Sequence, residues 1–94
     1  MAGGTAEPVL ALLKADLGVT HTKRDEYFAA LTAAAAKMLR TEGVVLDLSD
    51  QGDQLLLEMY AAHLHERRQQ PTMAMPRYLR AKINNRLCHQ QMQG

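Results

Sequence analysis

The fold is decided by residues 22–43, whose sequence is TKRDEYFAALTAAAAKMLRTEG. Apolar side chains recur in this stretch every three or four residues, which is the period of an amphipathic helix. Thr22 stands three residues before Asp25, so we expect the two to form a capping box at the helix start, with Asp in place of the usual Glu or Gln. Gly43 is expected to end the helix, because glycine tolerates the left-handed conformation found after many helices. The predicted buried stripe consists of Tyr27, Phe28, Leu31, Ala34, Ala35, Met38 and Leu39.

On the N-terminal side of this stretch, residues 8–17 predict a short helix. Pro8 suits the first helical turn, and Gly18 is a natural stop. On the C-terminal side, residues 44–48 have the sequence VVLDL and favour a strand, but the chain offers no partner segment. We therefore expect an extended link there. The predicted inward face of the first helix consists of Val9, Leu10, Leu13 and Leu17.

Two more helices are expected after the link. Ser49 or Asp50 caps the third, which ends near Arg68 or Gln69 because Pro71 forbids its continuation. The fourth begins at Pro76. Its predicted buried residues are Leu79, Ile83 and Leu87, and those of the third helix are Leu55, Leu56, Met59, Ala62 and His63.

These segments predict an all-α protein: a small bundle of about four helices, the first short, with an extended link before the third. We expect residues 1–7 to be a flexible N-terminus, residues 8–88 to form a single helical domain, and residues 89–94 to be a flexible tail. No apolar run approaches the roughly 20 residues of a membrane span, so no membrane association is expected. The lone cysteine, Cys88, offers no internal disulfide.

Charge is distributed unevenly along the chain. The net charge is +1 over 94 residues, yet residues 1–62 carry five basic and nine acidic side chains, and residues 63–94 carry six basic side chains and only Glu66 as an acid. The two parts therefore have net charges of −4 and +5. Such a dipolar chain suits contact with an anionic partner or head-to-tail contact between copies of itself. Arginines that simply solvate the last helix are the alternative.

The residues carry no recognisable catalytic or metal-binding pattern. His63 and His65 are two apart and point to different faces of a helix, so they cannot chelate one metal as an i, i+4 pair does. Asp47, Asp50 and Asp53 resemble part of a calcium loop, but the bidentate Glu of such loops is missing, and we interpret them as a solvated helix cap. The chain also lacks a phosphate-binding glycine loop and a nucleophile elbow. We expect a protein that is not an enzyme and has no metal and no cofactor.

Residues 66–80, with the sequence ERRQQPTMAMPRYLR, instead predict a surface that meets another macromolecule. A basic helix end runs into a loop with two prolines and two methionines, and methionine is favoured where a surface must fit a partner. The same methionines are also suited to covering the core. The candidate surface for a partner or for DNA consists of Arg67, Arg68, Met73, Met75, Arg77, Arg80 and Arg86.

Several short blocks of the sequence resemble small helical head–tail connector proteins of long-tailed bacteriophages. The first is residues 13–19, LKADLGV, followed by a helix with Tyr27–Leu31 and an alanine-rich middle. The second half of the resemblance is carried by residues 59–64, MYAAHL, by Arg67-Arg68, by Met75-Pro76-Arg77 and by Asn84-Asn85-Arg86-Leu87. Together these blocks span about residues 9–88.

The resemblance implies an all-α subunit that assembles into a closed ring of about a dozen copies. In this family the ring sits between the portal and the tail and lets DNA pass out of the capsid. The family's C-terminal extension, which docks onto neighbours, is short here. The resemblance implies no catalytic residues.

We therefore expect a structural phage or prophage protein, made in the bacterial host cytoplasm and located at the head–tail junction of the virion. Its partners would be copies of itself, the portal and tail-side proteins, with non-specific contact to DNA. The alternative is a small dimeric regulator whose fourth helix reads DNA with Asn84 and Asn85. The seven-residue stretch from Gln69 to Met75 is longer than the 3–4-residue turn of a helix-turn-helix, which counts against that reading.

Overall fold

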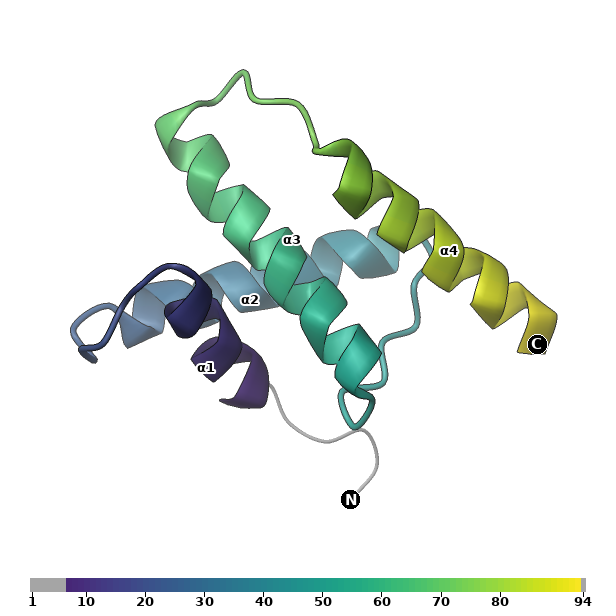
Figure 1. Ribbon diagram of the computed structural model, residues 1–94, viewed down its shortest axis with the longest axis horizontal. Coiled ribbons are helices and arrows are strands. Elements are labelled where there is room, and N and C mark those ends of the chain that lie inside the picture. The colour runs from purple at the N-terminus through teal and green to yellow at the C-terminus, as the bar shows by residue number, and fades with distance from the viewer. Residues whose placement is uncertain (1–6, 94) are drawn as a thin grey trace.

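The computed structural model describes residues 7–93, which form four helices joined by irregular links (Figure 1). No strand occurs in this range, so the predicted all-α class is confirmed. The molecule is flat, with principal extents of 41 × 36 × 18 Å. The helices are α1 Glu7–Asp16, α2 Asp25–Thr41, α3 Gln51–Gln69 and α4 Arg77–Gln93.

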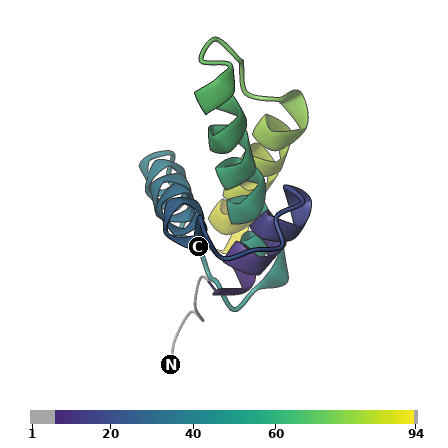
Figure 2. The same ribbon diagram turned by 90° about the vertical axis from the view of Figure 1, so that its left-hand side faces the viewer.

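Helix α2 forms one layer of the molecule, and α1, α3 and α4 form a second layer that covers one side of α2 (Figure 2). The buried side of α2 is the apolar stripe expected from the sequence, with Phe28, Leu31, Ala35 and Leu39 in the core. Ala34 and Met38 were predicted to lie inward and are exposed instead. The reason is geometric, because α2 is covered from one side only and its flanks remain in solvent.

The start of α2 differs from the predicted capping box. The helix begins at Asp25, and no side chain caps its first turn. Thr22 takes part in a preceding turn, in which its carbonyl oxygen accepts a hydrogen bond from the Asp25 N–H at 3.2 Å. The capping-box prediction is therefore wrong. The predicted stops are confirmed, since Gly18 and Gly43 follow α1 and α2 with φ angles of 72° and 102°.

Helix α3 is central, because it contacts the other three helices. Asp50 caps it, as predicted, by accepting a hydrogen bond from the Asp53 N–H at 3.0 Å. Leu55 was predicted to be buried and is 41% exposed at the edge of the contact with α1. A helix with neighbours on several sides buries more than one stripe, and the deepest apolar side chains of α3 are Leu56, Leu57, Tyr60 and Ala61.

Helix α4 buries Leu79 and Ile83 completely and Leu87 in part, as predicted. It is longer than expected, because residues 89–93 continue the helix where a tail had been predicted. The Gln90 side chain fixes this last part against the link before α3, as described below. The predicted flexible N-terminus, residues 1–7, lies outside the described residues except for Glu7, which begins α1.

Candidate interaction surfaces

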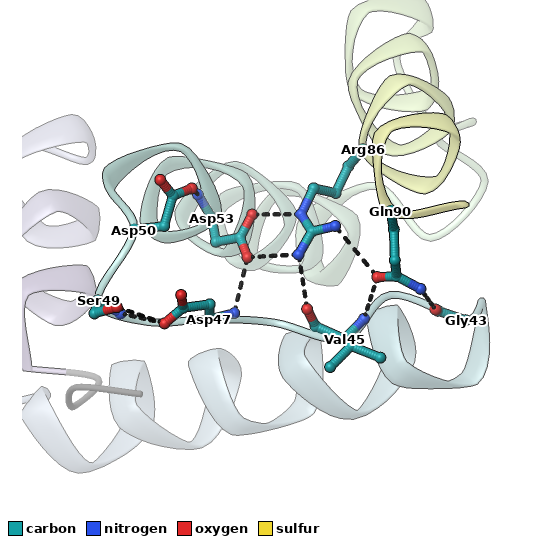
Figure 3. Close-up of polar contacts among 8 residues, drawn as sticks. All are labelled: Gly43, Val45, Asp47, Ser49, Asp50, Asp53, Arg86 and Gln90. Carbon is teal, nitrogen blue, oxygen red and sulfur yellow. Dashed lines mark hydrogen bonds and ion pairs between the residues drawn. The ribbon is translucent and has the colours of Figure 1, made fainter. Parts of the chain in front are cut away.

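A buried ion pair between Arg86 and Asp53 joins the C-terminal half of α4 to the start of α3 (Figure 3). Arg86 Nε donates to Asp53 Oδ1 at 2.6 Å, and Arg86 Nη2 donates to Asp53 Oδ2 at 3.0 Å. The Asp53 side chain is only 3% exposed. The hydrogen bond to Asp53 raises the pKa of the Arg86 guanidinium. Arg86 therefore serves the fold, although the sequence had placed it among the surface candidates.

The same contact holds the extended link 44–48 in place. Arg86 Nη2 also donates to the Val45 carbonyl at 2.8 Å, and the Val45 N–H donates to Gln90 Oε1 at 2.9 Å. Gln90 Nε2 donates to the Gly43 carbonyl at 2.9 Å, and the Asp47 N–H donates to Asp53 Oδ2 at 2.8 Å. Side chains thus satisfy backbone groups that a second strand would otherwise pair. This explains why a β-favouring sequence forms no strand here.

Arg80 is also held within the molecule. Its guanidinium donates to both Glu42 carboxylate oxygens, at 2.6 and 3.3 Å. The pair is more exposed than that of Arg86, with side-chain exposures of 44% for Arg80 and 27% for Glu42. It joins the first turn of α4 to the end of α2.

The opposite end of α4 is open. Arg67, Arg77 and Tyr78 are exposed around the α3–α4 connection, and no hydrogen bond or ion pair within residues 7–93 holds the two arginines. Tyr78 is 65% exposed. We call the three residues, together with the exposed Arg68, the basic edge. Arg68 also lies against Tyr27, with its guanidinium carbon 4.8 Å from the ring centroid.

The two predicted methionines lie beside the basic edge and are half-buried. Met75 packs against the core, as the alternative reading of this loop required. Met73 keeps part of its surface in solvent, and its N–H donates to the Gln70 carbonyl at 2.9 Å. The seven sequence candidates therefore separate into two internally paired arginines, two half-buried methionines of the loop, and three arginines at the surface.

An open groove of about 500 Å³ lies between the start of α3 and the C-terminal half of α4. We call it the acidic groove, because Asp47 and Asp50 line it and Arg86 neutralises its third carboxylate, Asp53. Hydrogen bonds from Ser49 keep the pKa of Asp47 below its ordinary value, so this carboxylate stays ionised. The other lining residues are Gly52, Leu56, Lys82, Asn85 and His89.

Sequence reasoning missed Glu58, a buried carboxyl on the side of α3 that faces α1. Its Oε2 atom has no hydrogen-bond partner among the described residues. Burial, together with the neighbouring Asp16 carboxylate, raises its pKa to about 7. The available signal was a single acid inside the apolar run LLLEMYAA, residues 55–62. Leu55, Ala61 and Ala62 stand about one helical turn away, so the acid shares its face of the helix with apolar side chains.

Two histidines of α3 have different surroundings. His63 is buried, and this burial is the main cause that lowers the pKa of its imidazole. The positive charge of the nearby Arg67 lowers the pKa further. His65 shares a 2.9 Å hydrogen bond with the Tyr27 hydroxyl. In residues 7–93, no three His, Cys, Asp or Glu side chains come close enough together to hold a metal ion. The residues of the basic edge and of the acidic groove can make ion pairs and apolar contacts.

Comparisons with protein-family models, with curated proteins and with solved structures gave no match. Within the described range, no helix has the length and apolar character required to cross a membrane.

Proposed function

We propose that this protein is a non-enzymatic structural subunit that assembles head to tail with copies of itself. The proposal follows from the basic edge and the acidic groove, which lie at opposite ends of α3. Nineteen helical residues separate the two ends by about 28 Å at 1.5 Å per residue. A contact between unlike ends of successive copies is heterologous, and it gives a closed ring where the rotation between neighbours closes.

The composition of the basic edge supports a role in binding protein. Tyrosine, arginine and methionine are the residue types enriched in interface cores, and a few such anchors supply most of the binding energy. Tyr78 and Arg77 are neighbours at the first turn of α4, and Met73 lies in the loop before them. In the proposed contact, Arg67 and Arg77 of one copy enter the acidic groove of the next and approach Asp47 and Asp50.

Together with the resemblance to phage connector proteins, this arrangement leads us to propose a head–tail connector of a phage or prophage. The protein would be made in the bacterial cytoplasm and would act between portal and tail in the virion. Arginines not used between subunits would face the DNA passage. Their attraction to the phosphate backbone would be sequence-blind and would weaken as salt increases.

The dimeric DNA-reading alternative has less support. Helix α4 would have to present basic side chains to the major groove, but Arg80 and Arg86 are paired with Glu42 and Asp53. The link between α3 and α4 spans residues 70–76, longer than the turn of a helix-turn-helix. Asn84 and Asn85 remain exposed on α4.

The first test is the absolute mass by light scattering after gel filtration, at low and at high salt. The proposal predicts a closed oligomer several times the 10.5 kDa subunit mass at low salt, which dissociates as salt screens the charged contact. The double variant Arg67→Glu/Arg77→Glu should not form this head-to-tail oligomer. Lys82→Glu reverses a charge in the lining of the groove, away from the basic edge, and makes the groove more acidic, so this variant would strengthen assembly or leave it unchanged. Assembly of the double variant at wild-type strength would contradict the proposed contact.

A further inference from the structure

A second surface of the molecule, separate from the basic edge and the acidic groove, lies on the outer side of α2. Figure 2 shows this helix uncovered on the side facing away from α1, α3 and α4. An exposed helix face is ordinarily rich in charged and polar side chains. Here its middle is apolar, and the exposed residues there are Ala29, Ala30, Ala33 and Ala34.

An apolar groove of about 250 Å³ adjoins this face. Its lining includes Leu10 from α1, Leu48 from the link and Leu57 from α3, and the side chains of Ala29, Ala33 and Ala36 form its border along α2. Thr32 is the one lining residue with a polar side chain, and its hydroxyl is already bonded to the Phe28 carbonyl at 2.9 Å. The groove therefore offers no polar group to a ligand and favours an apolar occupant.

The charges that border the apolar face are arranged symmetrically about its centre. Glu26 lies four residues before Ala30, and Lys37 lies four residues after Ala33. Residues 26, 30, 33 and 37 follow the i, i+4, i+7, i+11 spacing of a single helical stripe. All four are exposed. An antiparallel copy of α2 that sets Ala30 against Ala33 also sets Glu26 against Lys37, twice by symmetry.

We propose that this face binds a second copy of the chain, with the two α2 helices packed antiparallel about a two-fold axis. Alanine side chains let helix axes approach to about 8 Å, the short end of the usual range. The stripe on each helix meets the identical stripe on the other, which is the condition for a self-complementary two-fold contact. The groove beside Leu10 and Leu48 extends the apolar surface that the second copy covers.

The charges select the direction of the contact. A parallel pairing would set Glu26 against Glu26 and Lys37 against Lys37, and like charges on neighbouring helices repel. In the antiparallel arrangement Arg40, one turn after Lys37, also approaches Glu26 of the second copy. Lys23 precedes α2 and lies near that Arg40, which reduces the electrostatic gain. The apolar contact therefore supplies most of the affinity.

The test is sedimentation velocity of the full chain over a range from micromolar to millimolar concentration, in the background Arg67→Glu/Arg77→Glu so that the basic edge does not contribute. We expect a reversible monomer–dimer equilibrium. Ala33→Arg should raise the dissociation constant at least tenfold, because the long side chain holds the helices apart. The matched control is Ala81→Arg, the same change at an exposed alanine of α4, which should alter the constant less than twofold.

A charge exchange tests the antiparallel register. Glu26→Lys and Lys37→Glu should each weaken the dimer. The double variant should bind more tightly than either single variant, because both pairs are restored with reversed sign, but it should stay below the parent affinity because Arg40 then faces Lys at position 26. Circular dichroism verifies that each variant remains helical. A parent that stays monomeric at millimolar concentration overturns the proposal. So does an Ala33→Arg variant that dimerises as well as Ala81→Arg, or a double charge exchange that fails to recover.

Discussion

The two ends of α4 carry the same residue type and use it differently. In the C-terminal half, Arg86 is paired with a buried carboxylate and a backbone carbonyl. At the N-terminal end, Arg77 projects from the surface beside the exposed Tyr78. A basic segment therefore cannot be interpreted as a binding surface from its composition alone. What decides the role of each arginine is whether an acid from a distant part of the chain reaches it.

Replacing each of these two arginines by alanine should give the largest difference in the free energy of unfolding. Arg86→Ala leaves Asp53 buried without its cation, and breaking a buried pair from one side costs on the order of 3–5 kcal/mol. Arg77→Ala is the matched control in the same helix and should change the free energy of unfolding by no more than about 0.5 kcal/mol. Urea denaturation measures both. Equal losses for the two variants would show that Arg86 has no structural role.

Glu58 extends the comparison to a buried carboxyl that lacks a cation. Its pKa of about 7 lies above the ordinary value of 4.5, so the folded state binds a proton more tightly than the unfolded chain does. Stability from this group is complete below about pH 4.5 and is lost as the pH rises toward 7. Burial of Glu58 is the larger cause of the raised pKa. Because solvent screens the smaller effect of the exposed Asp16 carboxylate, we expect the loss of stability to be roughly 1–2 kcal/mol.

The Glu58→Gln variant tests this expectation. It keeps the size of the side chain and removes its titration. The free energy of unfolding, measured by urea at pH 5 and at pH 8, should fall more for the wild type than for the variant, by the amount given above. Asp16→Asn should reduce the difference in part. Identical pH dependence of wild type and Glu58→Gln would contradict the raised pKa.

Gln90 also joins the C-terminal half of α4 to the link before α3. Gln90→Ala removes hydrogen bonds to Gly43, Val45 and Arg86, and we expect a loss of about 1 kcal/mol because the exposed partners rebind water. Hydrogen exchange should show faster exchange at the Val45 amide, whose acceptor is lost. The control is Gln91→Ala, an exposed glutamine in the same turn. Unchanged exchange at Val45 would show that Gln90 does not hold the link.

Arg80 occupies the intermediate position, with a partner but considerable exposure. Arg80→Ala should cost about 0.2–1 kcal/mol, as for other exposed ion pairs, and raising the salt concentration should reduce the cost further. Denaturation at two salt concentrations measures it. A loss as large as that of Arg86→Ala would mean that exposure does not distinguish the two pairs.

Local patterns predicted the helices well, and contacts between distant residues account for what they missed. The stripe of Phe28, Leu31, Ala35 and Leu39 and the stops at Gly18 and Gly43 depend on neighbours within a few residues. The Arg86–Asp53 pair spans 33 residues, and the Gln90–Gly43 contact spans 47. No local pattern marks either contact, so the helical end of α4 was mistaken for a tail.

The candidate surface for a partner was also predictable only in part, because the sequence shows helix ends but does not show contacts between distant residues. The exposed Arg67 and Arg68 lie in the last turn of α3, and Arg77 begins α4, so all three stand at helix ends that the prolines of the loop define. Arg80 and Arg86 look identical to them in sequence and differ only through Glu42 and Asp53. Leu55 shows the same limit for the core, because which side of α3 is covered depends on where α1 packs.

The most direct test of head-to-tail assembly mixes two variants that are each expected to fail alone. The first, Arg67→Glu/Arg77→Glu, makes the basic edge acidic; the second, Asp47→Lys/Asp50→Asn, removes the negative charge of the groove and keeps a side chain able to cap α3. Light scattering at low salt should find neither variant above a dimer, and the mixture should form the wild-type oligomer because each altered surface meets its complement. A mixture that remains no larger than its components, while the wild type assembles, would contradict the proposed contact between the basic edge and the acidic groove.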